Sequence, residues 1–145
     1  MFQRIVVGTD GSESATNALK EAARLTALCS GELHVVSGYH PKSALSVTGA
    51  GSGVEPWMVG SEYEVEGILR DAKDIARREK IEVTTHHEAG NPAKALVTIA
   101  EKVGADLIVV GNRGMKGLKG KVLGSVPNEV SHHASCAVLI LNTTS

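Results

Sequence analysis

Residues 106–125 read DLIVVGNRGMKGLKGKVLGS. The opening segment, Asp106–Gly111, is almost entirely apolar, which is typical of a strand that is buried on both faces of a parallel sheet. Five glycines fall within residues 111–125, and a helix is predicted over Ser125–His133. A buried strand that passes through a glycine-rich segment into a helix indicates an α/β domain whose loop allows a ligand to approach the backbone closely.

Four other segments complete the set of predicted strands. Two of them, Ile5–Thr9 and Leu33–Val36, are rich in β-forming residues, and a third, Ala137–Leu141, is nearly continuously apolar, so it is predicted to be buried on both faces. The fourth, Ile81–His86, alternates in polarity and is predicted to be an edge strand. Apolar residues at three-to-four spacing predict the intervening helices, which cover Ser12–Leu28, Glu62–Lys80 and Pro92–Val103. This alternation predicts one doubly wound domain over residues 1–145, a five-stranded parallel sheet with helices on both faces.

Capping residues support two of these predicted helices. One long connection has no predicted helix or strand. Ser12 or Ser14 can cap the first helix, and Asn91-Pro92 followed later by Gly104 marks the start and end of another. The segment Tyr39–Gly60 carries the Gly/Ser-rich run GAGSG and is predicted to be a lid, a binding loop or a locally disordered region.

The composition is that of a soluble globular domain and excludes several classes of protein. Fifteen basic and sixteen acidic residues give a net charge of −1, and aromatic residues make up 3% of the chain. Neither value favours nucleic-acid binding. No apolar run approaches the roughly 18 residues of a membrane span, and no signal-peptide pattern precedes the first predicted strand. We therefore expect a cytoplasmic protein, with Cys29 and Cys136 as small buried residues in a reducing compartment.

The candidate site lies where the first and fourth predicted strands end. Ligands of open α/β sheets bind at the carboxyl ends of strands where the strand order reverses. Here those ends lead into residues 8–12 (GTDGS) and into the glycine-rich residues 111–125. Backbone amides that open onto a helix N-terminus, with Lys116, Lys119 and Lys121 nearby, suit a phosphate. The alternative is a flexible connection that carries solvated lysines.

Several familiar catalytic and metal motifs are absent from the sequence. There is no GxxxxGK[ST], no GxGxxG at the first helix, no GxSxG and no HExxH. The adjacent histidines His86 and His87 would point to opposite faces of a strand, and His132 and His133 would diverge on a helix. We therefore predict no metal site and no catalytic residues, with the histidines solvated near element ends.

The glycine-rich stretch resembles the universal stress protein family. Nucleotide-binding members of that family carry G-x-x-G, nine residues, and then G-[ST]. Here Gly111 and Gly114 are followed by nine residues and then by Gly124-Ser125. The segments IVVGTDGSESA, LHVV and CAVLIL also resemble the family, so the resemblance covers nearly the whole chain. It implies the strand order 3-2-1-4-5.

The resemblance also implies a role for each matching residue. Asp10 would hold the ribose hydroxyls, because a carboxylate can accept two hydrogen bonds. Val35 would contact adenine, and the backbone of Gly8 and Thr9 would pass beneath the nucleoside. The glycine motif and the helix start after it would form the phosphate-binding segment, which comprises Gly111, Asn112, Arg113, Gly114, Gly124, Ser125 and Val126. The two residues within the first G-x-x-G vary in the family, so their individual roles stay open.

The implied function is the binding of an adenine nucleotide by a stress-response regulatory protein. ATP is the main candidate ligand, with AMP and cyclic AMP as alternatives, and Mg²⁺ would accompany ATP. The resemblance further implies a homodimer joined through residues 137–141, whose apolar edge would otherwise invite aggregation. Two other functions stay open: a slow nucleotide hydrolase, in which Asp10 is a general base, and a nucleotide-free dimeric scaffold.

Overall fold

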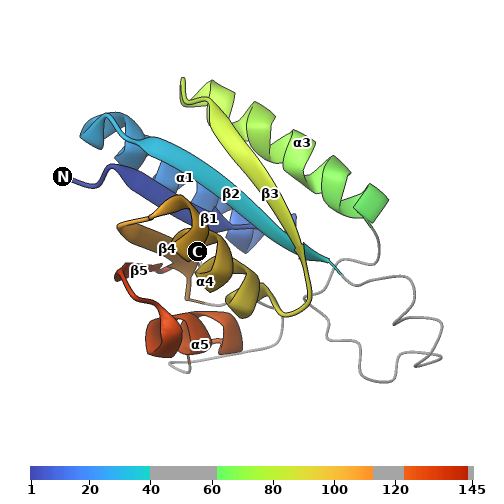
Figure 1. The fold of residues 1–145 in the computed structure, drawn as a ribbon. Coiled ribbons are helices and arrows are strands. Elements are labelled where there is room, and N and C mark those ends of the chain that lie inside the picture. The colour runs from blue at the N-terminus through green and yellow to red at the C-terminus, as the bar shows by residue number, and fades with distance from the viewer. Residues whose placement is uncertain (40–61, 113–122, 144–145) are drawn as a thin grey trace.

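The structure is a computed structural model, and it describes residues 1–39, 62–112 and 123–143. In these residues five parallel strands form one sheet in the order β3-β2-β1-β4-β5, which confirms the predicted doubly wound fold and strand order (Figure 1). The strands are β1 (Arg4–Gly8), β2 (Glu32–Tyr39), β3 (Val83–Ala89), β4 (Leu107–Gly111) and β5 (Ala137–Leu141).

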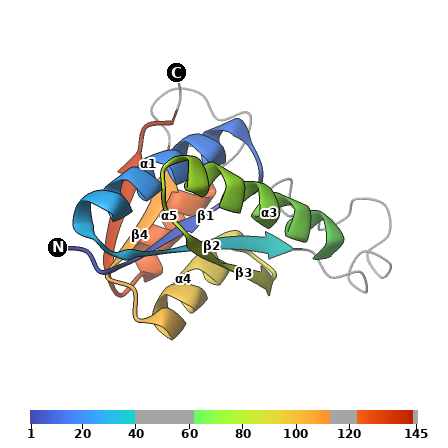
Figure 2. The same ribbon diagram turned by 90° about the horizontal axis from the view of Figure 1, so that it is seen from above.

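Helices cover both faces of the sheet, as predicted. They are α1 (Glu13–Cys29), α3 (Glu62–Arg78), α4 (Pro92–Val103) and α5 (Ser125–His133). Figure 2 shows the sheet between α1 and α3 on one side and α4 on the other. Within the described residues no helix is long and apolar enough to cross a membrane.

Two hydrophobic cores result from the alternation of side chains along the central strands. Val7 and Val35 point into the core beneath α1 and α3, together with Val65 and Leu69 of α3. The intervening strand residues point the other way, toward α4 and α5, and include Val6, Val36, Ile108 and Val110. Both faces of the central strands are therefore buried, which explains their nearly continuous apolar sequence.

The predicted helix boundaries have the expected capping interactions. Ser12 caps α1, and its hydroxyl accepts a hydrogen bond from the backbone N–H of Ala15 at 3.1 Å. Asn91 caps α4 through its side-chain oxygen, which accepts from Ala93 N at 2.8 Å. Gly104 ends α4 with φ of 67°, a left-handed conformation that favours glycine. The contacts of Ser12 and Asn91 fix the starts of α1 and α4, which border the site.

Several details differ from the predictions. β3 runs over Val83–Ala89 rather than over Ile81–His86. β2 has 8 residues and continues past Val36 to Tyr39, because the polar Ser37 and Gly38 remain paired with β3. β5 is only half-buried, since it is an edge strand and its residues Ala137 and Leu139 face outward. The two cysteines, predicted to be buried, are partly exposed and free.

Candidate functional site

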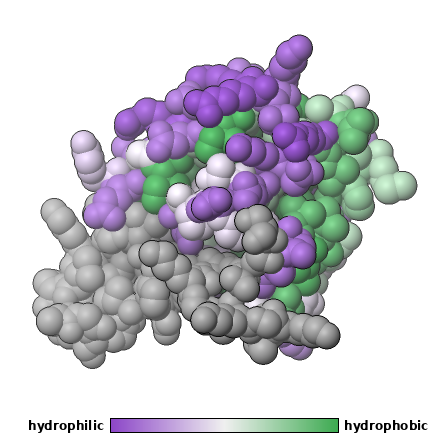
Figure 3. Space-filling view, turned by 180° about the vertical axis from the view of Figure 1, so that it is seen from behind, coloured by the Kyte–Doolittle hydropathy of each residue, from purple (hydrophilic) through white to green (hydrophobic). Residues whose placement is uncertain are grey.

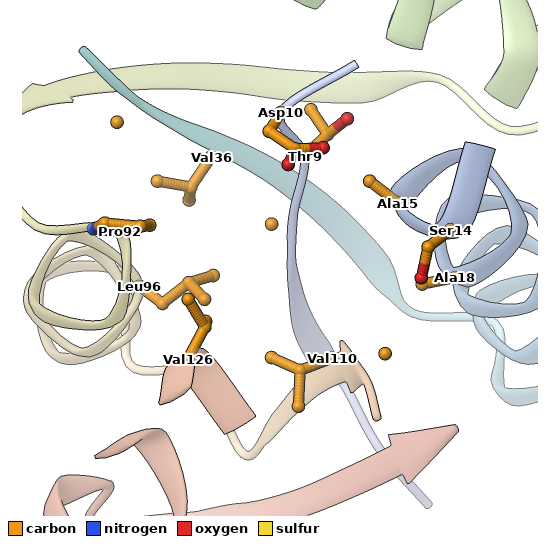
Figure 4. Close-up of a pocket in the computed structure, with 13 residues that line it drawn as sticks. Thr9, Asp10, Ser14, Ala15, Ala18, Val36, Pro92, Leu96, Val110 and Val126 are labelled. Atoms are coloured by element: carbon orange, nitrogen blue, oxygen red, sulfur yellow. The ribbon is translucent and has the colours of Figure 1, made fainter. Parts of the chain in front are cut away.

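A pocket opens at the carboxyl ends of β1 and β4, at the point where the strand order reverses (Figure 4). Residues of β1 and the turn after it, β2, β4 and three helices form its wall. The lining residues are Gly8, Thr9, Asp10, Ser14, Ala15, Ala18, Val36, Gly38, Pro92, Leu96, Val110, Gly111 and Val126. Five of the residues predicted from the sequence, Gly8, Thr9, Asp10, Gly111 and Val126, are among them.

The polar part of the lining lies in the turn between β1 and α1. The Oγ1 atom of Thr9 accepts a hydrogen bond from Gly11 N at 3.1 Å, and the Oδ1 atom of Asp10 accepts one from Ser12 N at 2.9 Å. These bonds hold both side chains at the mouth of the pocket. The second carboxylate oxygen of Asp10 has no hydrogen-bond partner in the described part of the chain, so it is available to a ligand.

The opposite wall is apolar and comes from β2, α4 and α5. In Figure 4 the side chains of Val36, Pro92, Leu96 and Val126 lie together across the pocket from α1. A Cβ atom at Gly8 would lie 3.1 Å from Cδ1 of Leu96, so a larger residue here would need the Leu96 side chain to shift. This wall suits the flat apolar face of an aromatic ring.

The base of the glycine-rich segment closes beside the pocket. The backbone N–H of Gly124 donates to the carbonyl oxygen of Asn112 at 3.0 Å, and Asn112 N donates to the carbonyl of Leu141 at 2.7 Å. The chain therefore leaves β4 and returns to α5 at one place, next to Gly111. Of the predicted binding residues, Arg113 and Gly114 lie outside the described residues.

The N-terminus of α5 has no side-chain cap among the described residues. Its N-cap residue is Gly124, with φ of −61° and ψ of 164°, so this glycine is not in the left-handed region. Ser125 is exposed, and the third helical residue, Pro127, has no backbone N–H. The remaining first-turn amides and the helix dipole form a site that favours an anion.

Val35, which the resemblance places against adenine, is not among the residues that line the pocket. Its side chain is fully buried in the core beneath α1 and α3, and Val36 lines the pocket instead. Ser14, Pro92 and Leu96 also line the pocket and were missed. The sequence could have indicated Val36, because side chains alternate along a strand. Val35 shares one face of the sheet with Val7, so Val36 points to the opposite face. No local pattern distinguishes Pro92 and Leu96 from other residues of an amphipathic helix.

The prediction of solvated histidines is wrong for one pair. His34 is 8% exposed, and its Nδ1 atom lies 2.9 Å from Nε2 of His86, while its Nε2 atom lies 3.3 Å from Oε1 of Glu32. The cause is position in the sheet: His34 lies within β2, which β1 and β3 flank on both sides. In the described residues no group of three or more histidine, cysteine or carboxylate side chains is placed to hold a metal ion.

The chain is a doubly wound α/β domain with a pocket at its switch point. The chain matches the model of the universal stress protein family over residues 1–142. It is 36% identical over 144 residues to universal stress protein Rv1636 of Mycobacterium tuberculosis, covering 99% of this chain and 98% of that protein. Universal stress protein YxiE of Bacillus subtilis is 34% identical over 149 residues, covering 97% and 99%. The chain belongs to the universal stress protein family.

Solved structures show the same fold. A universal stress protein crystallised in complex with cAMP superimposes with a TM-score of 0.75 and 33% identity, covering 99% of this chain and 98% of that chain. The universal stress protein of Archaeoglobus fulgidus in complex with dAMP gives a TM-score of 0.69 and 26% identity, covering 95% and 96%. Both relatives therefore bind adenine nucleotides.

Proposed function

We propose that the switch-point pocket binds an adenine nucleotide, with ATP as the main ligand. The observation that carries the proposal is the convergence at one pocket of the Thr9-Asp10 turn, an apolar wall and the uncapped N-terminus of α5. These three parts match the sugar, the base and the phosphates of a nucleotide. The two relatives in complex with cAMP and dAMP support the choice of an adenine nucleotide.

The three parts of the pocket support one orientation of the proposed ligand. The adenine ring lies against the apolar wall, which Val36, Pro92 and Leu96 form. The ribose hydroxyls donate to the free carboxylate oxygen of Asp10. The phosphates lie toward Ser125 and the glycine-rich segment, away from the negative charge of Asp10, because like charges repel. With ATP, Mg²⁺ would bind mainly through phosphate oxygens and water.

The wider role follows from the family and is part of the same proposal. We infer a cytoplasmic, homodimeric regulatory protein that responds to stress through its nucleotide occupancy. AMP and cyclic AMP are the competing ligands, and direct comparison of their affinities with that of ATP decides among them.

Binding is tested by the melting temperature of protein from which nucleotide has been removed. A ligand at about 100 times its Kd adds roughly 2.7 kcal/mol to the free energy of unfolding. For a domain of this size that corresponds to an increase of about 5–11 °C. If ATP, AMP and cyclic AMP all leave the melting temperature unchanged, the proposal is wrong.

The variant Asp10→Asn tests the ribose contact. It keeps an oxygen that can accept from Ser12 N, so α1 should still start normally. It removes the charge, and we expect a loss of affinity of about 10-fold, because charge-assisted hydrogen bonds are roughly twice as strong as neutral ones. Asp74→Asn on the exposed side of α3 is the matched control and should bind as the wild type does. Titration calorimetry measures both affinities.

A further inference from the structure

The segment that follows β5 contacts the pocket through a chain of hydrogen bonds. The side-chain oxygen of Asn112 accepts from the backbone N–H of Thr143 at 3.1 Å and from its hydroxyl at 3.3 Å. The hydroxyl oxygen of Thr143 is in turn hydrogen-bonded to the hydroxyl of Ser14. Ser14 lines the pocket from the first turn of α1, so a pocket residue is linked to the chain beyond β5.

One direction satisfies all of these hydrogen bonds together. A backbone N–H always donates, so its bond to Asn112 identifies that side-chain atom as the amide oxygen, which carries no proton. Thr143 must therefore donate its hydroxyl proton to Asn112. Because a hydroxyl has a single proton, Ser14 is the donor to Thr143 when Thr143 donates to Asn112. The proton of Ser14 is thus committed to Thr143, and its oxygen is left as an acceptor.

Close packing keeps this arrangement in place. A Cβ atom added to Gly111 would lie 3.0 Å from Oγ1 and 3.1 Å from Cγ2 of Thr143, and 3.2 Å from Oγ of Ser14. Gly111 does not have a positive φ, and a side chain here would require the Thr143 and Ser14 side chains to shift. The Thr143 and Ser14 side chains therefore lie directly over Gly111, beside the pocket.

We propose that Ser14 is a specificity-determining residue that accepts a hydrogen bond from a sugar hydroxyl, and that Thr143 and Asn112 are positioning residues that hold it as an acceptor. The inference rests on the proposed function. An acceptor is unsuited to a phosphate, which offers acceptor oxygens, whereas a ribose hydroxyl can donate. The Ser14 oxygen and the Asp10 carboxylate then make the polar side of the pocket an acceptor surface, which selects ribose over a sugar that lacks a hydroxyl.

The test compares the affinity of ATP with those of 2′-deoxy-ATP and 3′-deoxy-ATP. In the wild type both analogues should bind more weakly than ATP. In Ser14→Ala the difference in affinity between ATP and one of these analogues should disappear, because the affinity for ATP falls by about 2- to 10-fold. The difference in affinity between ATP and the other analogue should remain. Ser131→Ala on α5 removes an exposed helix hydroxyl and should change neither difference.

A second variant tests the positioning residues without altering Ser14. Thr143→Val keeps the branched shape and frees the Ser14 proton, so the discrimination against the same analogue should shrink, while Thr143→Ser should restore it. If Ser14→Ala and Thr143→Val bind ATP and still discriminate against both deoxy analogues as the wild type does, the inference is wrong and the proposed function stands. If Ser14→Ala instead weakens ATP but not adenosine, Ser14 contacts phosphate and the inference is also wrong. If the wild type binds no adenine nucleotide, both proposals fail.

Discussion

At the scale of single residues, the histidine pair between β2 and β3 makes the stability of the fold depend on pH. Burial lowers the pKa of His86 below its ordinary value of 6.5; His34 and Lys102 act in the same direction, and Glu88 opposes them. His86 is therefore protonated at a higher pH in the unfolded chain than in the folded chain. The contribution to stability is full above about pH 6.5 and is lost as the pH falls toward the lowered pKa.

The variant His86→Gln should remove this dependence. Glutamine does not titrate, so the free energy of unfolding should change less between about pH 7.5 and 5.5 than in the wild type. Urea denaturation across that range measures the slope. His132→Gln, which replaces an exposed histidine on α5, is the control and should keep the wild-type slope. An unchanged slope in His86→Gln would show that the pair does not set the pH dependence.

At the scale of elements, the N-terminus of α5 is the part of the site that we expect to bind the phosphates. Losing a hydrogen bond to a charged group costs about 1.5–3 kcal/mol, or roughly 10- to 150-fold in affinity. Ser125→Ala should weaken ATP binding by about that factor, because Ser125 is the first residue of α5 and its side chain is exposed. Affinities from titration calorimetry, together with an unchanged melting temperature of the free protein, check this expectation.

Binding of adenosine distinguishes residues that contact the phosphates from residues that contact the ribose. Ser125→Ala should leave adenosine binding unchanged, because adenosine has no phosphate. Ser14→Ala should weaken adenosine and ATP by similar factors, because both carry the ribose hydroxyls. Equal losses of ATP and adenosine in Ser125→Ala would mean that Ser125 does not contact phosphate, and the orientation of the ligand would have to be reversed.

The sequence predicted the elements of this fold better than the wall of its pocket. Buried parallel strands have a strong local signature, so β1, β4 and the bounds of α4 and α5 could be predicted. The glycine motif likewise located the base of the loop beside β4. The pocket wall also depends on contacts between distant segments, such as Thr143 with Ser14 and Leu96 with Gly8, which no local pattern encodes. For the same reason the pairing of His34 with His86 was not anticipated.

At the scale of the whole molecule, the exposed edge of β5 predicts a homodimer. Figure 3 shows an apolar strip on the side of the molecule where β5 lies, and Leu139 of that strand is 38% exposed. Antiparallel pairing of two β5 strands across a two-fold axis would satisfy their edge backbone groups and cover this leucine. We therefore expect light scattering to give twice the chain mass of 15.1 kDa. A concentration-independent mass near 15.1 kDa would contradict the prediction.

The variant Leu139→Lys should shift this equilibrium toward the monomer, because two lysines would then face each other across the two-fold axis. Tyr63→Lys is the matched control, since Tyr63 is 85% exposed on α3, beside the opposite edge of the sheet, and should leave the dimer intact.

The variant Leu139→Lys also tests whether assembly and nucleotide binding are linked. Leu141 at the end of β5 accepts from Asn112 N at 2.7 Å, and Asn112 also closes the base of the glycine-rich segment. If dimerisation tightens nucleotide binding, nucleotide must strengthen the dimer by the same factor, because coupling between two binding equilibria is reciprocal.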